Sequence, residues 1–252
     1  MDRRAGLGAQ LAPCYRRSVK LSVVIPALDE AERIETAIRA AFDAPLDLAP
    51  AAPRSGTVEV IVVDGGSSDA TRDLAAAAGA RVLACERGRA RQLRAGVGAS
   101  SGDVVLLLHA DTLLPRGWHA AVCAALRDER VVGGAFRFRF DERSPVFRFI
   151  EFGARLRSDL WRLPYGDQAL FVRRRTLEAI GGVPEVPVME DLDLVQRMKR
   201  RGRLALLSAP AVTSTRRYRA GGPLRTMMRH WLAAAAWTLG VDRRRIQQWA
   251  GR

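Results

Sequence analysis

The chain has 252 residues, of which 48% are hydrophobic and 27% are charged, a composition typical of a globular domain rather than a disordered segment. Its formal net charge is +14, carried almost entirely by arginine. This charge attracts phosphates, anionic lipids or nucleic acid, but a solvated basic surface explains it at least equally well. The longest late apolar run, Trp231 to Val241, is about half the length of a membrane-spanning helix, so we expect no transmembrane segment.

The N-terminus and the cysteines indicate the compartment. Residues 1–19 carry arginines and no continuous apolar core, which argues against a secretory signal and predicts a flexible basic arm. The cysteines Cys14, Cys85 and Cys123 are odd in number, and their spacing fits neither a metal-binding knuckle nor a redox pair. We therefore expect reduced thiols and a cytoplasmic protein, at most peripheral at the inner face of the cell membrane.

The first half of the chain alternates short apolar runs with helical patterns. Strands are predicted at 21–26, 58–63, 81–84 and 104–108. Helices are predicted around 34–41, where Ile34, Ala37, Ile38 and Ala41 share one face, and over 69–78, 87–96 and 116–127. A proline-rich loop is predicted at 43–57. This alternation favours parallel strands with right-handed crossovers, the arrangement of a Rossmann-like nucleotide-binding unit.

The second half is less regular. Its predicted elements are a strand at 131–140, an amphipathic helix at 145–160, a turn into a strand at 165–172, a short helix at 174–180, a helix from 190 to about 200, two short strands near 203–207 and 211–216, and a last helix from 221 to about 239. The last helix carries methionines and tryptophans among arginines. It could lie on a membrane surface, but packing on the domain or on a second subunit is favoured.

Acidic residues follow three of the predicted strands. They are Asp29 with Glu30, Asp64, and Asp111, and a further pair, Glu190-Asp191, opens a predicted helix. Because ligands of an open parallel sheet bind just past the carboxyl ends of its strands, we expect these carboxylates to converge on one crevice. Neither Gly-x-Gly-x-x-Gly after the first strand nor Gly-x-x-x-x-Gly-Lys-Ser/Thr occurs, which disfavours dinucleotide binding and P-loop chemistry.

The central apolar run ends in His109-Ala110-Asp111-Thr112. An imidazole and a carboxylate two residues apart can share a divalent cation, and that cation can hold a diphosphate. The alternative is structural, because Asp111 or Thr112 could cap the helix that follows.

Four segments resemble those of inverting family 2 glycosyltransferases of the GT-A fold. They are Val24–Glu30, Val62–Thr71, Leu108–Thr112 and Met189–Leu194, and their order and spacing match across residues 20–215. The sequence is most similar to the bacterial subgroup assigned to arsenosugar biosynthesis. It departs from the family in having His109 where an Asp-x-Asp motif usually has its first aspartate, and in lacking the Gln-x-x-Arg-Trp motif of processive synthases.

The resemblance implies an α/β GT-A fold, in which a Rossmann-like, mostly parallel sheet is flanked by helices and followed by an acceptor-side half and a C-terminal helix. It implies the following division: arm 1–19, a single domain 20–220 with nucleotide-binding half 20–112 and acceptor half 113–220, and a helical extension 221–252. The implied reaction transfers a sugar from a nucleotide-sugar to a small-molecule or lipid-like hydroxyl acceptor. No nucleic-acid partner is expected.

The resemblance also implies residue roles. Asp191 matches the general base that takes the acceptor proton, and Asp111 matches the ligand of Mn²⁺ or Mg²⁺. His109 either is a second metal ligand or packs near the nucleotide, and the second is favoured. Arg216 and Arg217 either close over the diphosphate or form a solvated basic edge. The remaining predicted substrate-binding residues are Pro26, Ala27, Asp29, Glu30, Asp64, Arg87, Arg91, Asp167, Gln168 and Glu190.

Two other functions stay open from the sequence. A nucleotidyltransferase of the same fold usually shows a Gly-x-Gly-Thr-Arg/Lys signature after the first strand, and Pro26-Ala27-Leu28-Asp29 does not match it. A non-catalytic polyanion-binding module is suggested by the net charge of +14. Such a module would bind with steep salt dependence even without Asp111 and Asp191.

Overall fold

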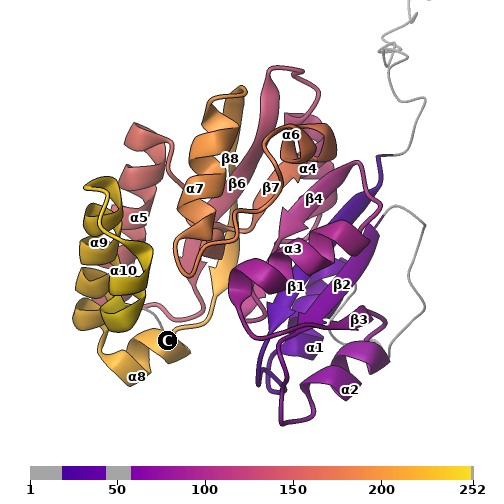
Figure 1. Ribbon diagram of the computed structural model, residues 1–252, viewed down its shortest axis with the longest axis horizontal. Helices are drawn as coiled ribbons and strands as arrows, with labels where there is room; N and C mark the ends of the chain where they lie inside the picture. The colour runs from indigo at the N-terminus through magenta and orange to yellow at the C-terminus, as the bar shows by residue number, and fades with distance from the viewer. Residues whose placement is uncertain (1–18, 44–57, 251–252) are drawn as a thin grey trace, which may run out of the picture.

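An eight-stranded sheet forms the centre of the protein in the computed structural model, which describes residues 19–43 and 58–250 (Figure 1). The strand order is β3-β2-β1-β4-β7-β6-β8-β5. The strands are β1 (Leu21–Ala27), β2 (Val58–Asp64), β3 (Arg81–Ala84), β4 (Val104–Leu107), β5 (Thr112–Leu113), β6 (Val131–Phe140), β7 (Leu170–Arg173) and β8 (Arg203–Thr213). Strands β1 to β4 pair in parallel, and β7 runs antiparallel between β4 and β6. The predicted α/β sheet is confirmed.

Helices cover both faces of the sheet (Figure 1). One face carries α1 (Ile34–Ala41), α2 (Thr71–Ala77) and α4 (Trp118–Ala125), and the other carries α3 (Arg89–Ala99), α6 (Arg174–Ala179) and α7 (Glu190–Lys199). Successive side chains of a strand point to opposite faces, so Val23 and Ile25 pack on the first layer while Val24 packs on the second. Burying both faces explains why these strands are continuously apolar in sequence.

A second group of helices lies beyond the β6–β8 side of the sheet, at the left of Figure 1. It consists of α5 (Pro145–Trp161), α8 (Arg216–Gly221), α9 (Pro223–Thr238) and α10 (Arg243–Ala250). Phe140, Phe147 and Ile150 form a small separate core where α5 meets β6. Asp193 of α7 ties α9 and α10 to the main body by accepting hydrogen bonds from Trp237 Nε1 (2.9 Å) and Arg243 Nη2 (2.7 Å).

Most predicted elements occur where the sequence placed them, with three differences, of which the first is the unpredicted two-residue strand β5. The two short strands predicted near 203–207 and 211–216 form one strand, β8, whose pairing with β6 shifts register between Leu207 and Pro210. Proline lacks a backbone N–H and is tolerated at such a bulge, so it interrupts the ladder without ending the strand. The C-terminal region contains α8 and α10 as well as the predicted long helix.

Residues 1–18 and 44–57 lie outside the described residues, so the predicted arm and most of the predicted loop are not described. Within the described residues, no helix is both long enough and apolar enough to cross a bilayer.

Candidate functional site

The loops that follow β1 and β2 are tied together by two carboxylates. The Asp64 carboxylate is buried and accepts hydrogen bonds from Gly66 N (3.0 Å) and from the backbone and hydroxyl of Ser67. Asp29 has a left-handed backbone (φ +52°), donates from its N–H to Ser67 Oγ (3.0 Å), and accepts from Ser68 N (2.8 Å). These contacts fix the loops at the carboxyl ends of two adjacent parallel strands.

Gln92 of α3 joins the ends of the same strands, and the sequence analysis did not single it out. Its buried Nε2 donates to the carbonyl oxygens of Ala27 (2.9 Å) and Val63 (2.8 Å). A Cβ at Gly65 would come within 3.0 Å of that nitrogen, so the glycine makes room for the amide. One signal in the sequence could have identified Gln92: it is a polar residue next to Leu93, on the helix face that packs on the sheet. Pro26 and Ala27 therefore lie in a rigid strand end.

Two arginines of α8 lie against the acidic residues of this edge. Arg216 Nη2 donates to Glu30 Oε2 (2.6 Å). Arg217 bridges two buried carboxylates, with Nη2 at 3.5 Å from Glu30 Oε1 and Nε at 3.6 Å from Asp111 Oδ2. Both arginines therefore pair with the acidic residues of this edge, while their side chains remain 39% and 50% exposed.

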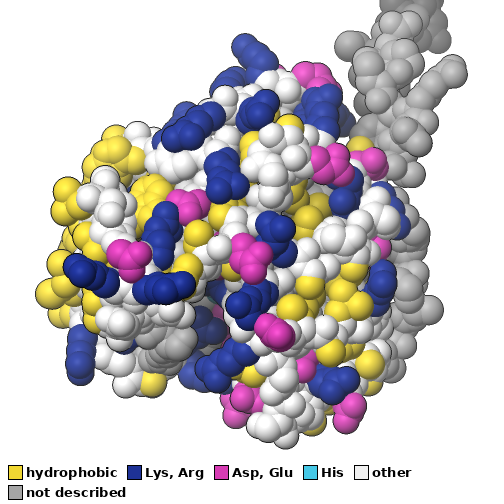
Figure 2. Space-filling model, viewed as in Figure 1, with side chains coloured by type: hydrophobic (Ala, Val, Ile, Leu, Met, Phe, Trp, Pro, Cys, Tyr) yellow, Lys and Arg dark blue, Asp and Glu magenta, His cyan; other side chains and the backbone are white. Residues whose placement is uncertain are grey.

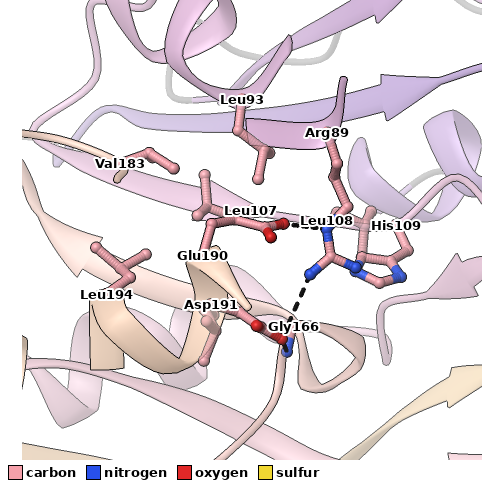
Figure 3. A pocket seen from close by; sticks show the side chains of 11 residues that line it. Arg89, Leu93, Leu107, Leu108, His109, Gly166, Val183, Glu190, Asp191 and Leu194 are labelled. Atoms are coloured by element: carbon pink, nitrogen blue, oxygen red, sulfur yellow. Dashed lines mark hydrogen bonds and ion pairs between the residues drawn. The ribbon is translucent and has the colours of Figure 1, made fainter. Parts of the chain in front are cut away.

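A second cluster forms where α3 and α7 begin (Figure 3). Arg89 Nε pairs with the buried Glu190 carboxylate, and Arg89 Nη2 lies 3.4 Å from Asp191 Oδ2. Burial alone would lower the pKa of Arg89, but the charges of Glu190 and Asp191 raise it, so the guanidinium stays protonated. Asp191 also accepts hydrogen bonds from Gly166 N (2.8 Å) and Leu192 N (2.9 Å), so its carboxylate is fixed from three sides.

His109 lies beside Arg89 in the same pocket (Figure 3). Burial, together with the nearby charges of Arg89 and Arg217, holds the pKa of His109 well below its usual value, so the imidazole is neutral at pH 7. A Cβ at Gly166 would come within 3.1 Å of both His109 Nε2 and Asp191 Oδ2. Gly166 therefore lets the strand end and the helix start approach the same turn.

Asp167 is the next residue of this turn. Its Oδ1 is buried without a hydrogen-bond partner. Burial raises the pKa of Asp167 to about 6, an effect that Arg157 opposes and that the charges of Asp191 and Asp111 increase. Asp167 lines a second pocket with aromatic side chains from β6, α8, α9 and the loop after α5, namely Phe138, Tyr165, Tyr218, His230 and Trp231. This pocket combines the Asp167 carboxyl and the Arg157 guanidinium with apolar and aromatic side chains.

Three predicted residues lie away from these clusters. Gln168 is buried, its Oε1 accepts from Arg157 Nη2 (3.0 Å) and its Nε2 donates to Phe136 O (3.0 Å), so it positions the turn from beneath. Arg87 is exposed, and Arg91 pairs with the exposed carboxylates of Glu86 and Glu185.

Among the arginines of residues 87–91, Arg89 is the one that pairs with Glu190 and Asp191, and the sequence analysis did not select it. All three arginines lie in one short run, 87–91, and the face that each occupies depends on where the helix begins. Helix α3 begins at Arg89, after Gly88 with a φ of +147°. This turn directs Arg89 toward α7. The residue at which the helix begins could not be predicted from the spacing of the arginines alone.

The carboxylates fit a metal only if the substrate supplies further ligands. Within the described residues, no cluster of three or more His, Cys, Asp or Glu side chains is placed to hold a metal ion. Asp111 Oδ1 is nevertheless buried and has no hydrogen-bond partner, which suits one protein ligand. Divalent cations at nucleotide sites commonly take one or two carboxylates from the protein and phosphate oxygens from the substrate. Asp111, with the neutral His109 nearby, has the chemistry of such a partial site.

Comparison with known proteins places this geometry in context. The family model described as glycosyl transferase family 2 matches residues 22–181. Glucosyl-3-phosphoglycerate synthase of Mycolicibacterium paratuberculosis is 36% identical over 105 residues, which cover 38% of this chain and only 29% of that protein. The matching protein of Mycobacterium tuberculosis is 35% identical over the same length.

Solved structures of the same fold include glucosyl-3-phosphoglycerate synthase from Mycobacterium tuberculosis with Mn²⁺, UDP and glucosyl-3-phosphoglycerate. Its TM-score is 0.62 at 23% identity, and the match covers 89% of this chain and 81% of that one. TarS of S. aureus in complex with UDP-GlcNAc has a TM-score of 0.58 at 15% identity, covering 77% of this chain and 58% of that one. At these identities the likeness establishes the GT-A fold.

Proposed function

We propose that this chain, which belongs to glycosyl transferase family 2, transfers a sugar from a nucleoside diphosphate sugar to an acceptor hydroxyl with inversion at the anomeric carbon. One observation carries the proposal. Asp111, at the end of the β4 region, and Asp191, at the start of α7, both lie close enough to Asp167 for their charges to act on it. We therefore propose that these two residues, a candidate phosphate-side carboxylate and a candidate base, flank one substrate site from opposite halves of the domain.

Asp191 is the proposed general base. An alcohol is a weak nucleophile at neutral pH, and a positioned carboxylate removes its proton as the oxygen attacks. The hydrogen bonds from Gly166 and Leu192 hold the carboxylate in one orientation. Arg89 lies beside it and is held in turn by Glu190, so we assign Arg89 and Glu190 to positioning the base.

The leaving nucleoside diphosphate develops negative charge, which this edge of the sheet is equipped to meet. Arg217 lies next to Asp111, and Arg216 next to Glu30. A divalent cation, Mn²⁺ or Mg²⁺, would be held by Asp111, with His109 as a second candidate, and would supply further charge stabilisation at the diphosphate. The relative solved with Mn²⁺ and UDP supports this choice and makes uridine the first base to test.

The nucleoside would lie on the loops after β1 and β2. Asp29, Glu30 and Asp64 are all engaged there in fixed contacts, so these loops are preorganised before any ligand binds. Pro26 and Ala27 form the adjoining wall. We propose the same division of labour as the sequence suggests, with residues 20–112 binding the donor and 113–220 shaping the acceptor side.

The acceptor would enter through the aromatic pocket that contains Asp167. With a pKa near 6, the Asp167 carboxyl can accept or donate a hydrogen bond to an acceptor hydroxyl. The relatives suggest phosphoglyceric acid as the first acceptor to assay. The aromatic side chains of the pocket instead favour a small or lipid-like hydroxyl compound. The sequence resemblance to the arsenosugar-biosynthesis subgroup adds a sugar-type acceptor to the panel.

We propose that the enzyme acts in the cytoplasm, with peripheral contact to the inner face of the cell membrane. The free thiols of Cys85 and Cys123 support a reducing compartment, while Cys14 lies outside the described residues.

The test of the base is Asp191→Asn. We expect UDP affinity in the presence of Mn²⁺ to stay within about twofold, while UDP release from UDP-glucose falls by roughly 10²- to 10⁴-fold. Release would be measured with water and with phosphoglyceric acid as acceptors. Asp73→Asn, an exposed carboxylate on α2, is the matched control and should leave both quantities unchanged. Release at the wild-type rate by Asp191→Asn would refute the assignment.

A further inference from the structure

The exposed large hydrophobic side chains of the described residues all lie in one region. They belong to α5, α9, the turn after α9, and α10. They are Phe149, Phe152, Leu156, Leu160, Trp161, Leu224, Met228, Trp231, Leu232, Leu239, Val241 and Trp249. Figure 2 shows hydrophobic side chains gathered at the left of the molecule, over these helices. A contiguous apolar patch on a globular protein commonly marks a binding or membrane surface.

The patch is organised as a stripe along each of two neighbouring helices. On α5, Phe149, Phe152, Leu156 and Leu160 recur at helical spacing. On α9 and just beyond it, the exposed apolar residues recur at the same spacing. They are Leu224, Met228, the adjacent pair Trp231 and Leu232, and Leu239. The two helices touch, because a Cβ at Gly153 would lie 3.4 Å from the ring of Trp231. We call this two-helix surface the α5–α9 face. Each helix thus has two apolar faces. One packs on the protein, and the other is exposed to solvent.

The α8–α10 side of the α5–α9 face is basic. Between Arg216 and Ala250 the sequence has eight arginines and one acidic residue, Asp242, and four of these arginines pair with carboxylates elsewhere in the protein. Arg225, Arg244 and Arg245 are exposed and form no ion pair with any described residue. This combination of apolar stripe and cationic rim complements a surface with an apolar interior and anionic head groups.

Charge also discriminates between possible occupants. A second copy of this chain would bring one basic rim against another, and like charges across an interface disfavour association. The N-terminal residues 1–18 carry four arginines and one acidic residue, so their net charge is positive as well. Three of the five tryptophans, Trp161, Trp231 and Trp249, are exposed on these helices, and tryptophan is enriched where protein meets the lipid head-group region.

We infer that the α5–α9 face docks the protein onto an anionic lipid bilayer, with the two apolar stripes at the acyl boundary and the arginines on the head groups. Trp231 belongs both to this face and to the lining of the aromatic pocket. Docking would therefore place that pocket next to the bilayer. The inference stands independently of sugar transfer, because it is tested by vesicle binding alone.

The experiment is sedimentation of the full chain with vesicles of phosphatidylcholine alone or of phosphatidylcholine mixed with phosphatidylglycerol. We expect binding only to the anionic vesicles, weakening as salt increases. Phe152→Ser/Leu232→Ser removes one apolar residue from each stripe, away from both pockets, and should weaken vesicle binding by about tenfold or more.

A charge pair of variants completes the test. Arg244→Glu/Arg245→Glu should weaken binding by at least about tenfold, since each arginine near an anionic surface contributes roughly fivefold. Arg72→Glu/Arg116→Glu changes the net charge equally at two exposed arginines, Arg72 on α2 and Arg116 just before α4, and should bind like wild type.

Several outcomes would overturn the inference. Failure of the wild type to bind anionic vesicles would do so, as would equal losses in the two charge variants. Light scattering provides a further arm: a wild-type dimer that Phe152→Ser/Leu232→Ser converts to a monomer would assign the face to a second copy.

Discussion

At the scale of single residues, Asp167 makes the most distinctive contribution to pH dependence. Burial raises its pKa from 3.8 to about 6, so the folded protein binds more protons than the unfolded chain between these values. Stability therefore falls as the pH rises through this window, by up to about 3 kcal/mol at pH 7 relative to pH below 4.

Asp167→Asn removes this titration. We expect the variant to gain stability relative to wild type as the pH is raised from about 4 to about 7.5, measured by urea unfolding at both pH values. Asp73→Asn, exposed on α2, should show no such gain. A stability difference between Asp167→Asn and wild type that does not change with pH would contradict the account.

Gly166 gives a second prediction at this scale. The Cβ of Gly166→Ala would lie 3.1 Å from both His109 Nε2 and Asp191 Oδ2, and 3.3 Å from Arg89 Nη2. We expect the base to be displaced and UDP release from UDP-glucose to fall by about 10²-fold, with UDP affinity little changed. Gly98→Ala, which meets no atom within 4 Å, is the control. Unchanged release by Gly166→Ala would show that the position of Asp191 is not critical.

A residue could be assigned to the candidate site from sequence only where it lies at the end of a predicted strand or the start of a predicted helix. Asp64, Asp111 and Asp191 could be selected because each follows or opens a recognisable element. Arg89 and Gln92 could not, because the face a helical side chain occupies depends on the residue at which the helix begins.

At the scale of elements, Asp193 is the contact that holds the C-terminal helices to α7. Asp193→Ala would remove the acceptor for Trp237 and Arg243. We expect faster hydrogen exchange across residues 223–250, corresponding to about 1–3 kcal/mol of lost local stability. Arg200→Ala, exposed at the end of the same helix, should leave exchange in that region unchanged. Protection equal to wild type in Asp193→Ala would mean that other contacts hold these helices.

Elements with a single strong pattern could be predicted well. Helix α1 buries Ile34, Ala37, Ile38 and Ala41, the four residues whose spacing predicted its inner face. The bulged strand β8 was predicted as two strands because a proline such as Pro210 commonly marks the end of a strand. Its tolerance at a bulge becomes visible only when the pairing with β6 is known. The two-residue strand β5 has no local signal at all, since it exists only through pairing with β8.

At the scale of the whole molecule, we propose that the two halves contribute different residues to one substrate site. The first half supplies the loops after β1 and β2 together with Asp111, and the second supplies Asp191 and the aromatic pocket. The sequence could predict the parallel half because its strands and helices alternate regularly. The α5–α9 face could not be predicted, because sequence shows that a helix is amphipathic but not which face its neighbours leave uncovered.

The central claim is that the crevice binds a nucleoside diphosphate through a cation on Asp111. The most direct test is calorimetric titration of UDP into wild type and Asp111→Ala, each with and without Mn²⁺, with GDP, ADP and dTDP as comparison ligands. We predict that one diphosphate, UDP first, binds wild type only with Mn²⁺, and that Asp111→Ala loses this metal dependence together with at least about tenfold in affinity. Equal binding to wild type and Asp111→Ala, with or without Mn²⁺, would contradict the claim.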